Sequence, residues 1–286
     1  MRNGKVLIGA ALVVVLAIAG FWWFSRPEKI PTTPPSTAPA VGSCWSVDNT
    51  AARGAFPWPG APVACTAAHT AEVYYVGQVD EALIRQEHKA SGDDKTIADN
   101  LMYAQARIAC GNFASVHLGD SWHTGQVSVL ASWITPAKSG FFGCALAQTT
   151  DAAGQQLSTR TTPLKGALAA SASTVKISCV DAAGGYAQCD QPHRNEFVGT
   201  YTVTPPSAPF NAAGLQQAVT KGCTDIIHTY LALAPGATRA DVTAAYVGPT
   251  TATDWLGSDQ TYACYAKTAT DVRGSLRNLG TRPLPS

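Results

Sequence analysis

The chain has 286 residues, with 20 Lys and Arg against 19 Asp and Glu, and a net charge of +1 at pH 7. Nucleic-acid binding needs a strongly basic surface, so we expect no nucleic-acid partner. The eight cysteines include no CxxC pair, which argues against a zinc ribbon or a thioredoxin-type redox site. An even cysteine count favours disulfides formed in an oxidising compartment.

The N-terminal region has the pattern of a membrane anchor. Residues 6–24 carry no charge, and as a helix they would span about 28 Å, close to the hydrocarbon core of a bilayer. Aromatic residues at 21–24 suit the membrane interface and do not resemble a small-x-small cleavage site. We therefore expect residues 1–24 to form a short cytoplasmic end and an uncleaved transmembrane helix, with a cleaved signal peptide as the alternative.

Residues 25–43 contain five prolines interleaved with threonine, serine and alanine. This composition favours an extended polyproline-II tether that holds the rest of the chain away from the membrane. We therefore expect the remainder of the protein to be extracytoplasmic.

Cysteine, histidine and glutamate occur twice at the spacing Cys-x3-His-x2-Glu. The two copies are Cys65-His69-Glu72 and Cys189-His193-Glu196. From Cys144 and Cys264 onward, the following segments also align without a gap, 120 positions apart. Self-similarity of this kind predicts an internal repeat. We expect two similar four-cysteine domains, at residues 44–166 and 172–286.

Both copies have the same predicted order of elements. In the first, we expect strands at 43–47, 63–66, 72–79, 126–134 and 141–149, and a helix marked by Ile97, Leu101, Ala104 and Ile108. In the second, we expect strands at 175–180, 187–189, 196–204, 242–247 and 260–268, and a helix marked by Leu215, Val219, Ile226 and Tyr230. Each domain is therefore α+β, with one principal helix packed on a small, mainly antiparallel sheet.

The order of these elements bears on the disulfides. Four cysteines permit three connectivities in each domain. The first two cysteines of each domain lie on neighbouring predicted strands, the third on the helix and the fourth on a late strand. This order favours the pairs Cys44–Cys65, Cys110–Cys144, Cys179–Cys189 and Cys223–Cys264.

The cysteine spacing, the repeated box and a Pro–Trp/Phe–Gly–Cys pattern resemble the septum-formation domain of actinobacterial membrane-anchored envelope proteins. The matching residues are Ser43, Cys44, Cys65, His69, Glu72, Val73, Cys110, Pro136, Gly143 and Cys144, and then Cys179, Cys189, Pro192, His193, Glu196, Cys223, Pro249, Trp255, Gly257 and Cys264. The first copy departs from the pattern: Ala68 replaces the usual proline, and Phe141 or Phe142 replaces the tryptophan. The resemblance implies a membrane-anchored extracytoplasmic protein associated with septation, and it supplies no catalytic residues.

The histidine and glutamate of each box have two interpretations. Three residues apart, His69 and Glu72, or His193 and Glu196, could converge as metal ligands, contact a partner or take part in catalysis. A metal site normally needs three or four ligands with support around them. We favour a structural role in which the histidine caps a turn and the glutamate begins a strand, and we expect no metal or cofactor.

A hydrolase is the alternative from a different class. Gly119-Asp120-Ser121 is similar to the opening block of GDSL hydrolases, and Asp225-x2-His228 is similar to their closing block. Ser121 would be the nucleophile, His228 the base and Asp225 the group that orients it. The duplication argues against this assignment, because it places these segments in matching parts of two separate domains. No GxSxG motif occurs either.

Tryptophans add a binding hypothesis. Trp45, Trp122, Trp133 and Trp255 could stack on sugars, although core packing is the more common role of such residues.

Taken together, the sequence predicts a non-enzymatic, single-pass membrane protein that binds other envelope or division proteins. The alternative is an anchored ester hydrolase that acts on envelope substrates.

Overall fold

The computed structural model describes residues 30, 32–134, 140–204 and 210–286, and Pro34–Ser286 form one compact unit. The expected transmembrane helix and the first part of the expected tether lie outside the described residues, as does Pro136. Within the described ranges, no helix combines the length and apolar character needed to cross a membrane.

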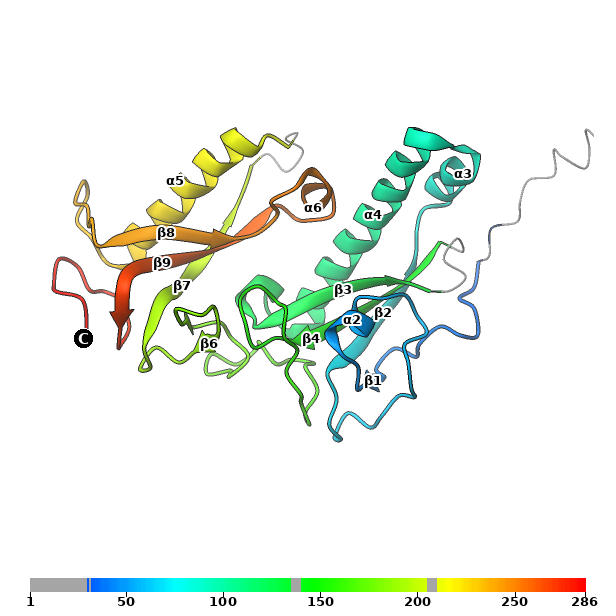
Figure 1. The fold of residues 1–286 in the computed structure, drawn as a ribbon, viewed down its shortest axis with the longest axis horizontal. Coiled ribbons are helices and arrows are strands. Elements are labelled where there is room, and N and C mark those ends of the chain that lie inside the picture. Colours follow the sequence, from blue (N-terminus) through cyan, green and yellow to red (C-terminus); the bar gives the residue numbers. More distant parts are fainter. Residues whose placement is uncertain (1–29, 31, 135–139, 205–209) are drawn as a thin grey trace, which may run out of the picture. The chain divides into compact units, whose positions relative to one another are not determined.

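The first part of this unit is built on a four-stranded antiparallel sheet with the order β1-β2-β4-β3 (Figure 1). Its strands are β1 (Cys44–Trp45), β2 (Ala71–Gln78), β3 (Val127–Trp133) and β4 (Phe141–Gln148). Because β4 is central and covered on both faces, seven of its eight residues are buried. This explains why β4 is almost continuously apolar in sequence rather than alternating.

One face of this sheet packs against α4 (Gly92–Leu118), which follows the shorter α3 (Glu81–Lys89). The buried stripe of α4 recurs every fourth residue: Ala98, Met102, Ala106, Cys110, Ala114 and Leu118. Small side chains dominate the stripe and let the helix lie close to the strands. The first turn of the helix contains Asp93 and Asp94, which suit the positive end of its dipole, and Gly119 caps the C-terminus in a left-handed conformation.

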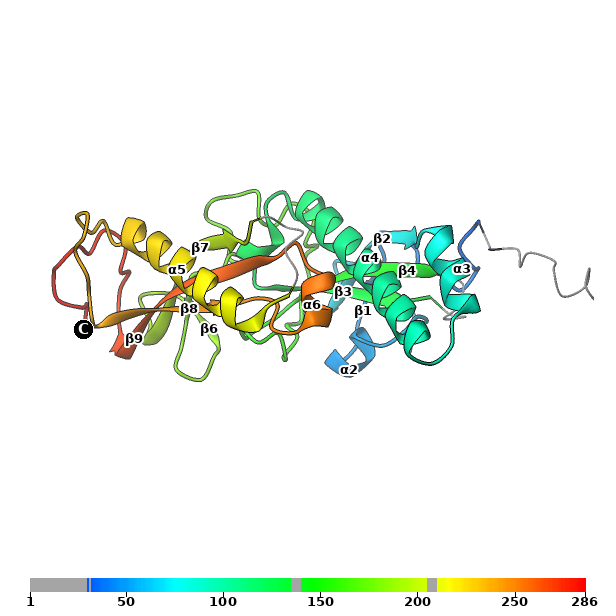
Figure 2. The ribbon, with the colours of Figure 1, turned by 90° about the horizontal axis from the view of Figure 1, so that it is seen from above.

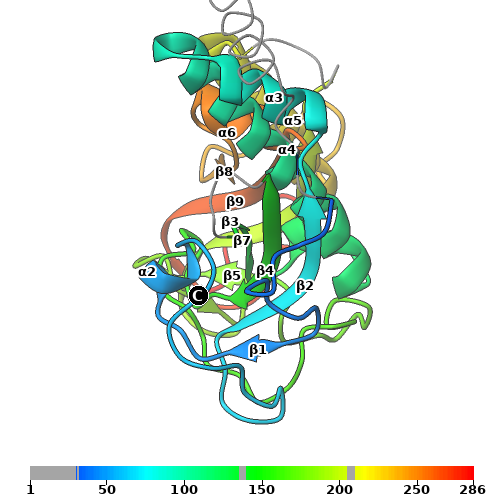
Figure 3. The same ribbon diagram turned by 90° about the vertical axis from the view of Figure 1, so that its right-hand side faces the viewer.

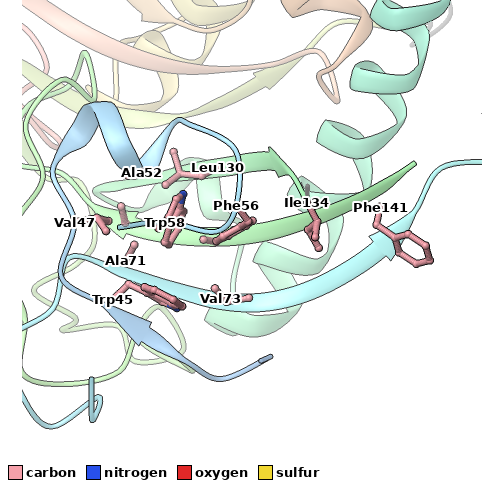
Figure 4. Close-up of a cluster of buried hydrophobic side chains, with 12 residues drawn as sticks. Trp45, Val47, Ala52, Phe56, Trp58, Ala71, Val73, Leu130, Ile134 and Phe141 are labelled. Carbon is pink, nitrogen blue, oxygen red and sulfur yellow. The ribbon is translucent and has the colours of Figure 1, made fainter. Parts of the chain in front are cut away.

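The other face holds an aromatic cluster supplied by α2 (Asn49–Ala52) and the segment that follows it (Figures 3 and 4). Phe56 and Trp58 lie 4.3 Å apart between ring centroids, and Trp58 meets Trp45 edge to face at 5.9 Å. Phe56 lies over Gly143 of β4, where any Cβ would approach the ring to 2.4 Å. The glycine is therefore required by this close approach.

The second part is a five-stranded antiparallel sheet with the order β6-β5-β7-β9-β8. Its strands are β5 (Cys179–Val180), β6 (Tyr186–Ala187), β7 (His193–Thr202), β8 (Val242–Val247) and β9 (Thr261–Val272). The helix α5 (Ala212–Tyr230) packs across β7, β9 and β8 (Figure 2). Gly222 of α5 is required because the Tyr201 ring occupies the space of a Cβ there.

Backbone hydrogen bonds join the two parts. Gln126 donates to Val175 (2.7 Å), and Ile177 donates to Thr124 (2.9 Å). The short helix α6 (Ala252–Leu256) also contacts α4. The two parts are therefore held together by direct noncovalent contacts, in addition to the covalent connection along the chain.

The structure agrees with most of the expected elements and corrects several. The helix predicted around residues 97–108 runs from Gly92 to Leu118, and Cys110 lies inside it rather than at its end. The expected strand at 63–66 is only an isolated bridge between Cys44 and Val63. The sequence interpretation missed α3, although Asp80 caps it by accepting a hydrogen bond from the Ala82 amide.

We expect Phe56→Ala to lower the free energy of unfolding by about 3–5 kcal/mol, because it removes a buried ring from the aromatic cluster and leaves a cavity. Denaturant unfolding measures the change. Val116→Ala is the control: Val116 is 78% exposed, and its truncation should change stability by less than about 0.5 kcal/mol. Equal effects of the two substitutions would contradict the proposed core.

Candidate functional site

The two Cys-x3-His-x2-Glu boxes occupy corresponding places in the two sheets. Glu72 of β2 lies opposite Cys44 of β1, and Glu196 of β7 lies opposite Cys179 of β5. The histidine of each box pairs with a late segment: His69 with Arg160, and His193 with Val272. Both histidines and both glutamates of the boxes are buried, with at most 5% exposed. In this fold they cannot reach a partner at the surface.

In the first box, both ring nitrogens of His69 face acceptors. Nδ1 lies 2.9 Å from the Ala67 carbonyl oxygen, and Nε2 lies 3.0 Å from Glu72 Oε1. Nδ1 is therefore suited to donate to the carbonyl, while Nε2 is hydrogen-bonded to the carboxyl group. The Leu164 amide donates to both carboxylate oxygens at 2.8 Å. The box thus fixes the chain that returns after β4.

In the second box, the glutamate has different partners. Glu196 Oε1 accepts from the Tyr230 and Ser275 hydroxyls, each at 2.5 Å, and Oε2 accepts from the Leu276 amide at 2.6 Å. Burial, and then the bond to Glu196, raises the pKa of Tyr230, so its hydroxyl stays a donor. His193 Nδ1 faces the Gln191 carbonyl at 2.8 Å, whereas Nε2 is buried without a hydrogen-bond partner among the described residues.

These bonds correct the gap-free alignment of the two segments after β4 and β9. That alignment equates Leu164 with Leu284, but the residue whose amide binds the second carboxylate is Leu276. The backbone hydrogen bonds that follow support the same correspondence between Leu164 and Leu276. Gly166 donates to the His117 carbonyl and Asn278 donates to the Tyr230 carbonyl, and both acceptors lie at the ends of the main helices. Between Cys144 and Arg160 there are eight more positions than between Cys264 and Val272.

The extra residues of the first part form a loop closed by the bridge between Thr149 and Leu157. Asp151 orders the loop by accepting from the Gln155 and Gln156 amides. The backbone of this loop is hydrogen-bonded to the β5–β6 turn. Ala152 donates to the Gly184 carbonyl at 3.0 Å, and Tyr186 donates to the Thr150 carbonyl at 2.9 Å. The loop therefore connects the two parts of the unit.

The structure forms the four disulfides that the order of the elements favours: Cys44–Cys65, Cys110–Cys144, Cys179–Cys189 and Cys223–Cys264. They divide into two kinds. Cys110–Cys144 and Cys223–Cys264 join the main helix to the sheet and are fully buried, with 0% exposure of each cysteine. Cys65 and Cys189 are partly exposed, so each of the other two disulfides has one partly exposed cysteine.

The hydrolase-like residues do not assemble. Ser121 lies in the turn after α4, and Asp225 and His228 lie on α5. Asp225 is mostly exposed and accepts a 2.6 Å bond from Lys221. Within the described part of the chain, no hydrogen bond connects Ser121 with His228 or His228 with Asp225. The arrangement of nucleophile, base and orienting group that this hypothesis requires is therefore not formed.

A groove of about 560 Å³ lies where the first part faces the second sheet. Its walls come from α4, the 3₁₀ helix η1 (Trp122–Thr124) and β3 on one side, and from β9 and the segment around α6 on the other. Tyr186 and Tyr265 line it, and burial raises the pKa of Tyr186 to about 12, so this phenol remains neutral. Ile108 and Val247 line it with 41% and 47% of their surface exposed.

A histidine–carboxylate pair lies in this groove. His123 Nε2 is 2.8 Å from Asp259 Oδ2, and the His123 and Trp122 rings lie 3.7 Å apart between centroids, tilted by 30°. Partial burial acts to raise the pKa of Asp259, but the hydrogen bond and charge of His123 outweigh it and hold the pKa below its ordinary value. The sequence analysis missed this pair because its members lie 136 positions apart.

The aromatic residues proposed for sugar binding are split by the fold. Trp45 and Trp255 are buried in the two cores, at 8% and 3% exposure. Trp133 is partly exposed in β3, and only Trp122 of the four lines the groove. The sheet boxes and the groove are thus separate features: the boxes are internal, and the groove is open to a ligand.

Comparison with known proteins identifies the family. The model of the family described as septum formation matches residues 36–264, most of the chain, so the chain belongs to the septum-formation family. The match is one stretch that runs through the first sheet and into β9 of the second. Neither a curated protein nor a solved structure gives a match.

We expect Glu196→Ala to lower the free energy of unfolding by about 3 kcal/mol or more, because a buried amide and two hydroxyls lose their charged acceptor. Denaturant unfolding measures the loss. Asp271→Ala is the control, since it removes a half-exposed carboxylate whose ion pair with Arg194 should contribute about 1 kcal/mol or less. A similar loss for both variants would rule out the structural role of Glu196.

The His123–Asp259 pair predicts a pH dependence. Because the folded pKa of Asp259 is lowered, its contribution to stability is present above the ordinary carboxyl pKa of about 3.9 and is lost as the pH falls through the folded value. Asp259→Asn should lower stability by about 0.2–1 kcal/mol at about pH 5, and the difference from the unmodified protein should shrink as the solution becomes more acidic.

Asp190→Asn is the matched control for this measurement. Asp190 is exposed, and the described residues give it no ion pair. Unfolding curves of the control should match those of the unmodified protein at about pH 5 and in the more acidic solution. A constant difference for Asp259→Asn at all pH values would contradict the assignment.

Proposed function

We propose that this protein is a single-pass, membrane-anchored protein of the cell envelope whose extracytoplasmic part binds other envelope or division proteins, without catalytic turnover. Membership of the septum-formation family supports the link to septation and the envelope. The apolar residues 6–24 support the anchor, and four disulfides support an oxidising location outside the cytoplasm. We propose an envelope of the actinobacterial kind, following the resemblance of the cysteine and His–Glu pattern.

We further propose that the two parts are tandem copies of one ancestral domain. Three equivalences support this. Each box glutamate lies opposite the first cysteine of its part, each main helix is joined by a disulfide to a late strand, and each box carboxylate binds a returning amide. The single family match then describes the duplicated form.

The observation that carries the binding proposal is the groove. It is large enough for a peptide segment or several side chains of a partner, and it combines aromatic, aliphatic and charged residues. The histidines and glutamates of the boxes are internal, which leaves the groove as the better candidate for recognition. Two copies of the domain would therefore form one shared site rather than two equal sites.

Site-specific photo-cross-linking in growing cells tests this proposal. A photoreactive residue at Ile108 or Val247 should cross-link to a discrete envelope protein, because both side chains are exposed where they line the groove. The same group at exposed Thr220 of α5, outside the groove, is the control and should give no such product. Cross-links of equal yield at all three positions, or at Thr220 alone, would contradict the groove as the binding site.

The absence of turnover is tested separately. We expect no esterase activity from the purified chain, and no effect of Ser121→Ala on any background activity. An esterase activity that Ser121→Ala abolishes would replace the binding proposal with the hydrolase.

A further inference from the structure

The second box contains a compact group of potential metal ligands. One atom each from Cys179, Cys189, His193 and Glu196 lie within 4.8 Å of one another. Cys179, His193 and Glu196 are buried, and Cys189 is partly exposed. Two sulfurs, one imidazole and one carboxylate form a donor set that suits Zn²⁺.

The hydrogen bonds around this group match those of a metal-binding histidine. His193 Nδ1 faces the Gln191 carbonyl at 2.8 Å, so Nδ1 carries the proton and Nε2 has the free lone pair. Nε2 is fully buried and has no hydrogen-bond partner among the described residues. A buried acceptor without a donor is costly, and a cation would satisfy it.

The carboxylate is also held in place. Two hydroxyls and the Leu276 amide position Glu196, as polar neighbours commonly orient a ligating carboxylate. Its oxygens together accept three hydrogen bonds, so one of the four lone-pair positions of a carboxylate remains for a metal.

The sulfurs of this group are joined as a disulfide, so they become strong ligands only after reduction. Cys189 is partly exposed, whereas both cysteines of Cys223–Cys264 and of Cys110–Cys144 are completely buried. A reductant can therefore reach Cys179–Cys189 while the two core disulfides still hold the fold.

We propose that Cys179–Cys189 is a thiol-gated zinc site. A dithiol reductant attacks the disulfide at Cys189, the more exposed of the two cysteines. The S–S bond breaks, and the reductant leaves as its own disulfide, having supplied two electrons and two protons. Zn²⁺ then displaces the two thiol protons and binds Cys179 Sγ, Cys189 Sγ, His193 Nε2 and a Glu196 oxygen. A tetrahedral ion with Zn–S distances of about 2.3 Å separates the sulfurs by about 3.8 Å, so the two sulfurs move apart once the disulfide is reduced.

The first box provides an internal comparison. There, Cys44, His69 and Glu72 form the compact group, without Cys65. His69 Nε2 is already bonded to Glu72 at 3.0 Å, so both ring nitrogens have partners. Reduction should therefore create one zinc site per chain rather than two.

The test uses the full chain in detergent, treated with a mild dithiol, with the new thiols identified by alkylation and mass spectrometry. Titration with Co²⁺ should give one bound ion per reduced chain with sulfur-to-cobalt charge-transfer absorption, and Zn²⁺ should displace it. The oxidised chain should bind none. No binding after Cys179 and Cys189 are shown to be reduced, or reduction of the core disulfides first, would overturn the proposal.

Two matched variants locate the site. His193→Gln should weaken Co²⁺ binding by at least about 10-fold, as expected for the loss of a ligand or its support. His69→Gln, the same change in the first box, should leave one ion bound with the original affinity. The reverse pattern, or equal binding by both variants, would overturn the assignment.

X-ray absorption of the Zn²⁺ form of the unmodified protein provides a measurement that does not depend on a variant folding. It should show two sulfur and two nitrogen or oxygen neighbours. A zinc coordination shell of four sulfurs, or a coordination shell that contains no sulfur, would exclude this site.

Discussion

The fold depends on two buried carboxylates. Glu72 and Glu196 each lie near the start of a central strand, opposite the strand that carries the first cysteine of that part. Each accepts the backbone amide of a leucine that follows the last strand, Leu164 or Leu276. A buried carboxylate is stable only when its lone pairs are satisfied, and these returning segments supply the donors. The glutamate, the returning chain and the end of the main helix therefore fix one another.

The two carboxylates have different hydrogen-bond partners, and this gives the two boxes different properties. His69 Nε2 is hydrogen-bonded to Glu72, whereas the Tyr230 and Ser275 hydroxyls donate to Glu196. The hydroxyls satisfy Glu196 without His193, and Nε2 of that ring is left without a partner among the described residues. The same arrangement of a buried glutamate and a leucine amide thus leaves both ring nitrogens of the histidine bonded in the first box. In the second box it leaves Nε2 of the histidine available to bind a ligand.

The asymmetry between the parts also accounts for the groove. The first part has eight more residues before its returning segment, and this loop bonds to the β5–β6 turn of the second sheet. Together with the His123–Asp259 pair and the bonds at Val175 and Ile177, the loop brings the first part against the face of the second sheet that α5 does not cover. The groove lies where this loop, the first sheet and α4 meet the second sheet.

Local patterns in the sequence predict much of this fold. The strand at 242–247 has the predicted bounds; the strand predicted at 126–134 is one residue shorter at each end, and the strand predicted at 141–149 is one residue shorter at its C-terminal end. The disulfide pairs follow from the order of the elements. The sequence could not reveal the eight-residue displacement, because identities at Thr281 and Leu284 favour the wrong register, and only the bond from Leu276 to Glu196 identifies the equivalent position. The sequence could not predict the groove, because its lining residues converge only through tertiary contacts.

Hydrogen exchange of the Leu164 and Leu276 amides in the native protein tests the central role of the two carboxylates most directly. Both residues lie in segments without regular secondary structure, where amides ordinarily exchange rapidly. If Glu72 and Glu196 hold these segments, both amides should be protected to the same degree as amides of the central strands β4 and β9. Exchange at the rate of an exposed loop amide would contradict the account.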